Sequence, residues 1–126
     1  MPFTQISLKK GTSQAFRTAL MEEVYLAMRE SIAIPEHDRF ATITELEPGN
    51  YNSSGDYAGV SRSENVIFIK ITLNTGRTLE LKKALYAAIA KRLSKNPGVR
   101  PEDIVICLVD VPVENWSLGN GEATYA

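Results

Sequence analysis

Two stretches of this sequence are near copies of each other and decide the fold: FTQISLKKG at residues 3–11 and FIKITLNTG at residues 68–76. Each residue of the second copy lies 65 positions after its counterpart, and the same offset pairs Ile34 with Val99 and Asp38 with Asp103. This period exceeds the roughly 20–50 residues that are typical of repeat arrays. We therefore interpret the chain as two copies of one supersecondary unit.

The first copy has the pattern strand, helix, strand. Apolar and polar residues alternate up to Gly11, and Thr12 or Ser13 can cap the helix that follows. Pro35 ends that helix, and RFATITEL at residues 39–46 predicts a second strand. The helix carries an apolar stripe at helical spacing, formed by Phe16, Leu20, Val24 and Met28.

The second copy repeats the pattern. NVIFIKITL at residues 65–73 and DIVICLVDV at residues 103–111 predict strands, and residues 78–95 between them predict a helix. NPG at residues 96–98 breaks that helix. The predicted apolar face of the helix consists of Leu81, Leu85, Ile89 and Leu93.

A β-α-β crossover is normally right-handed and places its helix on one face of the sheet. The sequence therefore predicts a single α+β domain over residues 1–126, with units at about 2–47 and 66–111. The two units would form a four-stranded mixed sheet with two helices on one face. Residues 48–65 between them are rich in Gly, Ser, Asn and Pro, which predicts a lid-like loop.

Composition excludes several functional classes from the prediction. The net charge is −1 and no run of Lys or Arg occurs, so we expect no nucleic-acid partner. No apolar stretch is long enough to predict a membrane span. The single His37 and single Cys107 predict neither a metal cluster nor a disulfide, and they fit a reducing, cytoplasmic location. We predict that Cys107 is a buried thiol, because it lies in an apolar run.

The opening MPF raises the question of catalysis by the amino end. Methionine aminopeptidases remove Met1 when the next side chain is small, and this would leave Pro2 with a free secondary amine. Amino groups titrate near ~8, and desolvation lowers that value. Such an amine could act as a general base at neutral pH. Retention of Met1 would instead make the Pro2 nitrogen an amide without basic character.

The chain resembles the tautomerase superfamily and, within it, the malonate semialdehyde decarboxylase group. The resemblance covers essentially the whole chain, and its motifs occur in the family's order: MPF at 1–3, IPEHDRF at 34–40, SRSENVIFIKIT at 61–72, GRTLELKK at 76–83 and NWSLGNGEA at 115–123. It implies a homotrimer with sites at subunit edges, acting on a small carboxylate substrate without metal or cofactor.

The resemblance also implies roles for individual residues. Pro2 would be the catalytic amine, and Asp38 would position or activate a water. Arg77 would hold the carboxylate of the substrate. Read from the residues alone, Asp38 is equally well a turn residue, since Asp103 occupies the equivalent place in the second copy. His37 is interpreted as an exposed loop residue.

The carboxyl-terminal motif implies a pocket wall. Trp116 matches an aromatic residue of the family's pocket, and Tyr125 is a candidate to close over the site. The sequence departs from the family at two places: Asn74 stands where some decarboxylases carry a second arginine, and Leu118 stands where several members carry a second aromatic residue. Asn74 would therefore change how the substrate carboxylate is held, and Leu118 would change the shape of the pocket.

Two reactions remain open in the predicted function. A neutral Pro2 amine would serve keto-enol tautomerisation of an oxo acid, whereas a protonated one would polarise a carbonyl for decarboxylation or hydration of the malonate semialdehyde type. Apolar neighbours lower the pKa of the amine and favour its neutral form, whereas a nearby carboxylate raises this pKa and favours the protonated form. The alternative from another class is a non-enzymatic, ferredoxin-like small-molecule-binding module, because two β-α-β units also build that fold.

Overall fold

The computed structural model describes all residues from Met1 to Ala126. Its strands are β1 (Phe3–Lys9), β2 (Ala41–Leu46), β3 (Ile67–Asn74) and β4 (Ile104–Val111), and its helices are α1 (Gln14–Ile32) and α2 (Leu79–Lys95). The two predicted β-α-β units are thus present in the predicted order.

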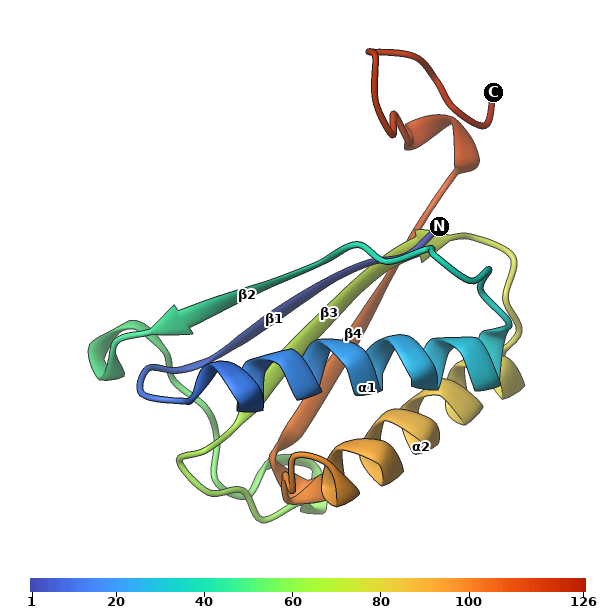
Figure 1. Cartoon of the computed structure of the whole chain (residues 1–126). Helices are drawn as coiled ribbons and strands as arrows, with labels where there is room; N and C mark the ends of the chain where they lie inside the picture. Colours follow the sequence, from blue (N-terminus) through green and yellow to red (C-terminus); the bar gives the residue numbers. More distant parts are fainter.

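The four strands form one mixed sheet in the order β2-β1-β3-β4. β1 is parallel to β2, β3 is parallel to β4, and the two central strands are antiparallel, with Ile6 opposite Ile69. The two units therefore meet through β1 and β3 and face in opposite directions. Both helices lie on the same face of the sheet (Figure 1). The predicted α+β fold is confirmed.

The core lies between the sheet and the helices. Alternate residues of the central strands point into the core, and so do the predicted apolar stripes of the two helices. Leu81 is an exception: it is 40% exposed, and α2 packs on the core only from Leu85 onward. The largest fully buried apolar side chains are Ile6, Leu20, Val24, Val66, Ile69, Ile71, Leu73, Leu85, Ile89 and Leu93.

Both helices begin with a hydroxyl cap. The Ser13 oxygen accepts a hydrogen bond from the Phe16 amide, and the Thr78 oxygen accepts one from the Leu81 amide. Arg77 therefore lies just before the cap of α2 and not in its first turn.

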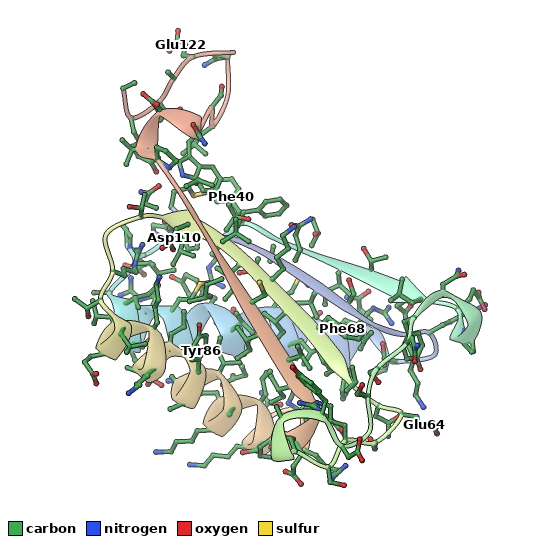
Figure 2. All side chains as sticks on the ribbon, turned by 180° about the vertical axis from the view of Figure 1, so that it is seen from behind. Phe40, Glu64, Phe68, Tyr86, Asp110 and Glu122 are labelled. Carbon is green, nitrogen blue, oxygen red and sulfur yellow. The ribbon has the colours of Figure 1, made fainter.

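The opposite face of the sheet has no helix over it (Figure 2). Phe68, which is labelled in that view, pairs with Val105, and Lys70 pairs with Cys107. Cys107 is exposed, so its predicted burial is wrong: side chains of a strand alternate between faces, and Cys107 falls on the open one.

Residues 48–65 join β2 to β3 and contain two short 3-10 turns, Pro48–Asn50 and Tyr57–Gly59. The Tyr51 hydroxyl donates to the Glu64 carbonyl. Because β1 and β3 are antiparallel, the start of β3 and the start of β1 lie at opposite ends of the sheet, and Figure 2 places Glu64 at the end opposite Phe40. The loop therefore does not cover Pro2 of its own chain.

Neither α1 nor α2 combines the length and apolar character that crossing a membrane would require.

Candidate active site

The amino end of the chain meets Asp38 at the start of the sheet. The Thr4 amide donates to the Phe40 carbonyl at 2.9 Å, which holds the turn before β2 against the start of β1. The amino group in the structure belongs to Met1, and it lies 3.9 Å from Asp38 Oδ2. The Met1 side chain is 2% exposed and that of Asp38 is 11% exposed, while Pro2 is buried. The side chains that surround this ion pair are therefore mostly shielded from water.

Burial dominates the electrostatics of this pair. It lowers the pKa of the Met1 amino group below its ordinary value, and Arg77 lowers this pKa further, whereas the Asp38 charge opposes the shift. Burial also raises the pKa of Asp38, against the attraction of the amino group and Arg77. Asp38 Oδ1 has no hydrogen-bond partner. An amine in this environment is biased toward its neutral, basic form.

Arg77 supplies the positive charge of the site. It follows β3 and is half-buried, and its guanidinium donates to the Asn74 carbonyl at 3.1 Å. No carboxylate of the chain forms an ion pair with it, although most of the other arginines have one. Its charge acts on both Asp38 and the amino group. The structure thus places the amino end beside Asp38, with Arg77 near enough for its charge to act on both, and the guanidinium of Arg77 has no ion-pair partner in the chain.

Trp116 is held against the same corner by Asn74. Its indole nitrogen donates to Asn74 Oδ1 at 2.6 Å, so Asn74 contacts both Trp116 and Arg77. Sequence reasoning treated Asn74 only as a departure from the family pattern and missed this connection. The available signal was an amide side chain at the last residue of the strand, three positions before Arg77.

Residues 112–126 form an arm that extends from the end of β4 beyond the sheet (Figure 1). The arm folds on itself, since the Leu118 amide donates to Thr124 Oγ1 and the Thr124 amide donates to the Trp116 carbonyl. Leu118 and Tyr125 are exposed on it, at 37% and 45%. Their predicted contacts with a substrate remain predictions. His37 is exposed, as expected for a loop residue.

A cavity of about 260 Å³ lies beside Asp38, between α1 and the start of β2. Thr4 lines it and is 1% exposed, and its hydroxyl has no hydrogen-bond partner. The sequence analysis did not identify Thr4, because a threonine in a strand is an ordinary residue. In the whole chain no three His, Cys, Asp or Glu side chains gather in a group that could hold a metal ion.

The chain is similar in sequence to known proteins over nearly its whole length. The family model described as "Tautomerase enzyme" matches residues 38–119. The protein "Probable tautomerase YusQ" of Bacillus subtilis (strain 168) is 41% identical over 123 residues, which cover 98% of this chain and 97% of that protein. "Probable tautomerase YrdN" of the same organism is 27% identical over 126 residues, covering 99% of this chain and 96% of that protein.

Solved structures show the same fold. The FG41 malonate semialdehyde decarboxylase inhibited by 3-bromopropiolate is 32% identical with a TM-score of 0.91, over 98% of this chain and 93% of that one. A symmetric trimer of fused 4-OT is 26% identical with a TM-score of 0.79, over 98% of this chain and 97% of that one. These likenesses agree with the duplicated fold and with the corner where the amino end meets Asp38. The chain therefore belongs to the tautomerase superfamily, in the group that resembles malonate semialdehyde decarboxylase.

Proposed function

We propose that this protein is a cofactor-independent enzyme that tautomerises a small oxo acid through the amine of Pro2, after removal of Met1. The observation that carries the proposal is the convergence of the amino end, Asp38 and Arg77 at one buried corner of the sheet. The reaction requires only groups of the chain itself.

In the proposed reaction, Arg77 binds the substrate carboxylate and fixes the position of the enol. The neutral Pro2 amine takes the proton of the enol hydroxyl while the carbonyl double bond forms. The resulting ammonium returns that proton to the adjacent carbon, so the amine is regenerated and no atom is gained or lost. The Asp38 carboxylate stabilises the ammonium form of Pro2 during the proton transfer, because a nearby negative charge favours the charged amine.

Decarboxylation or hydration of the malonate semialdehyde type is the second candidate. It is favoured by the likeness to two malonate semialdehyde decarboxylase structures, at 32% and 25% identity and TM-scores of 0.91. It would need a protonated Pro2 amine, whereas burial lowers the pKa of the amino group found at this corner, that of Met1, and we expect the same direction for the Pro2 amine. We therefore place tautomerisation first.

The open sheet face and the projecting arm support a homotrimer as the working form. Phe68, Val105 and Cys107 lie on a face that no element of the chain covers, and burial of such a face requires a partner. Fused 4-OT, to which the chain is similar, forms a symmetric trimer. Light scattering on the purified protein should give three times the mass of the chain; a monomer would contradict this proposal.

The catalytic proposal is tested by comparing Pro2→Ala with the wild type on phenylenolpyruvate and malonate semialdehyde. We expect kcat/KM for phenylenolpyruvate to fall at least about 100-fold, the lower range of a general base's contribution. Pro48→Ala, at an exposed loop proline, is the matched control and should leave the rate unchanged. Equal rates for Pro2→Ala and wild type would favour the binding-module alternative.

A further inference from the structure

The carboxylate of Asp38 is not fixed by hydrogen bonds of its own. Oδ1 has no hydrogen-bond partner, and Oδ2 lies 3.9 Å from the amino group of Met1, beyond hydrogen-bond distance. The charge interaction between the two groups weakens as their distance grows. The distance between Asp38 and the amino end must therefore be set by the backbone that carries Asp38.

Asp38 lies in the turn between α1 and β2. The first part of this turn is held by Arg29 of α1, whose guanidinium donates to the Ile34 carbonyl at 3.1 Å. Its last part is held by the Thr4 amide, which donates to the Phe40 carbonyl at 2.9 Å. These two contacts hold the ends of the turn, and Asp38 lies between them.

Arg39, the next residue after Asp38, attaches this part of the turn to α1. Its guanidinium lies 3.7 Å from the centre of the Tyr25 ring and donates a hydrogen bond to the Glu22 carboxylate. Glu22 and Tyr25 are three positions apart, so they lie on the same face of α1. A planar guanidinium that stacks on a ring and binds a carboxylate is held in two directions at once. We call Arg39, Tyr25 and Glu22 the Arg39 clamp.

We propose that Arg39 is a positioning residue for Asp38, because the Arg39 clamp holds the turn so that the Asp38 carboxylate stays beside the terminal amine. The charges that act on Asp38 are those of the amino end and Arg77, whereas the Arg39 guanidinium lies over α1 and is paired with Glu22. Arg39 therefore acts on the site through position and not through its charge. This role rests on the proposed function only for the use that the site makes of Asp38 and the amine.

The second half of the molecule supports the proposal independently. The positions 65 residues after the three members of the Arg39 clamp carry Ala87, Ala90 and Ile104, which can form no such contact. In that half the carboxylate of Asp103 is held directly, by the amide and the hydroxyl of Ser63 at 2.7 Å each. The clamp is therefore present in the half where the aspartate carboxylate accepts no hydrogen bond and absent in the half where it accepts two.

The test follows the titration of the terminal amine of the intact protein by nitrogen-15 NMR. Asp38→Asn should lower the pKa of this amine by about 1, the lower end of the effect of an opposite charge within ~4–6 Å. Arg39→Met opens the clamp, so we expect a smaller fall of the same pKa as Asp38 moves away. The direct loss of a cation would instead raise this pKa, so the sign of the change separates positioning from charge.

Arg92→Met is the matched control. Arg92 also binds carboxylates of α1, those of Glu23 and Glu30, but it reaches them from α2. We expect this variant to leave the pKa of the terminal amine unchanged.

Two further variants test the route from Arg39 to the amine. Tyr25→Leu removes the ring under the guanidinium without changing a charge, and it should also lower the pKa of the amine. The double variant Asp38→Asn/Arg39→Met should titrate like Asp38→Asn alone, because Arg39 acts through Asp38. In an active enzyme, the rising limb of kcat/KM against pH should move to lower pH in Arg39→Met, as the amine does.

A pKa of the amine that is unchanged or raised in Arg39→Met would overturn the proposal, and so would a further fall in the double variant. The Arg39 side chain is 51% exposed, so we expect Arg39→Met to fold; if it does not, Tyr25→Leu decides the question. The titration requires no turnover and applies whether the terminal amine belongs to Pro2 or to Met1. A protein without tautomerase activity whose amine responds as expected would refute the proposed function and leave this inference standing.

Discussion

Asp38 and Asp103 hold equivalent places in the two halves of the molecule but have opposite surroundings. Asp103 is 2% exposed, receives two hydrogen bonds from Ser63 and lies 3.5 Å from Arg100. Asp38 has one oxygen without a partner and faces the amino end of the chain with the other. A fully bonded buried carboxylate stabilises the fold, whereas an incompletely bonded one is a group that chemistry can use.

The comparison extends to the neighbours of each aspartate. Position 2 carries Pro2, whose counterpart is Ile67 inside β3, with a nitrogen that is an amide. The counterpart of Arg77 is Thr12, whose hydroxyl donates to Glu45. A cavity of about 280 Å³ remains at the second end, but its amine, that of Lys9, lies 3.8 Å from Glu64, and its carboxylate, that of Asp103, accepts two hydrogen bonds. The duplicated fold provides two similar corners, and the chemistry is concentrated at one.

The largest expected effect on stability comes from truncating the bonded aspartate. Asp103→Ala would leave the Ser63 amide and hydroxyl without their partner, so we expect a loss of about 3 kcal/mol in the free energy of unfolding, measured by urea denaturation. Asp38→Ala removes a carboxylate that accepts no hydrogen bond at Oδ1 and only faces the amino group at Oδ2, so it should cost far less. Equal losses of unfolding free energy in the two variants would contradict the difference proposed between Asp103 and Asp38.

The largest expected effect on activity outside Pro2 comes from Arg77. Arg77→Gln removes the unpaired cation of the site, so we expect KM for a monocarboxylate substrate to rise about tenfold or more, because a hydrogen bond to a charged group contributes about 1.5–3 kcal/mol. Arg100→Gln, at the other corner, should leave KM unchanged. Substrate saturation curves at neutral pH measure both. A similar rise in both variants would mean that overall charge, and not this site, determines binding.

The pH dependence of activity should move in opposite directions in two variants. Tautomerisation needs the neutral amine, so kcat/KM rises with pH through the amine pKa. The charge of Asp38 raises the pKa of the Met1 amino group and that of Arg77 lowers it, and we expect both charges to act in the same direction on the Pro2 amine exposed when Met1 is removed. Asp38→Asn should therefore shift the rising limb to lower pH, and Arg77→Gln should shift it to higher pH. Profiles of kcat/KM that move together, or that do not move, would contradict the assignment of the amine as the base.

Asp38 should also give a small, pH-dependent effect on stability. Its pKa in the folded protein is raised above the ordinary value of 3.8, so its contribution to stability is fully present below that pH and is lost as pH rises through the raised pKa. We therefore expect Asp38→Asn to be more stable than the wild type at neutral pH and to lose this advantage on acidification. Thermal unfolding from pH 3 to pH 8 measures the difference.

The smallest expected effect concerns Trp116, the only tryptophan of the chain. Asn74→Leu removes the acceptor of the indole hydrogen bond, so we expect the fluorescence emission to shift to longer wavelength as the indole becomes hydrated, with a loss of about 1 kcal/mol in stability. Asn52→Leu, in the exposed loop, is the control. Unchanged emission in Asn74→Leu would show that Asn74 does not hold the arm.

Much of the fold was predictable because the same strand-helix-strand pattern occurs in both copies of the repeat. The constant offset of 65 residues, the helix caps and the apolar stripes predict both β-α-β units correctly. The exposure of Cys107 was not predictable, since an apolar run does not reveal which face of the sheet is open. The position of the loop opposite Pro2 follows from the antiparallel contact of β1 with β3, which the sequence pattern does not encode.

The residues of the candidate site were named from motifs, but the hydrogen bonds around them were not predictable. The structure places the Met1 amino group 3.9 Å from Asp38, and the charge of Arg77 acts on both groups; the catalytic roles of Pro2, Asp38 and Arg77 stay predictions. The link from Arg77 through Asn74 to Trp116 depends on one side-chain rotamer and one hydrogen bond between residues 42 positions apart. Thr4 was missed for a similar reason, because only three-dimensional packing shows that its hydroxyl lacks a partner.

The intact mass of the natively expressed protein tests the central claim most directly. The account predicts a mass lighter than the full chain by one methionine residue, which means that the amine beside Asp38 belongs to Pro2. A full-length mass would mean that the Pro2 nitrogen is an amide, and catalysis by Pro2 would be contradicted.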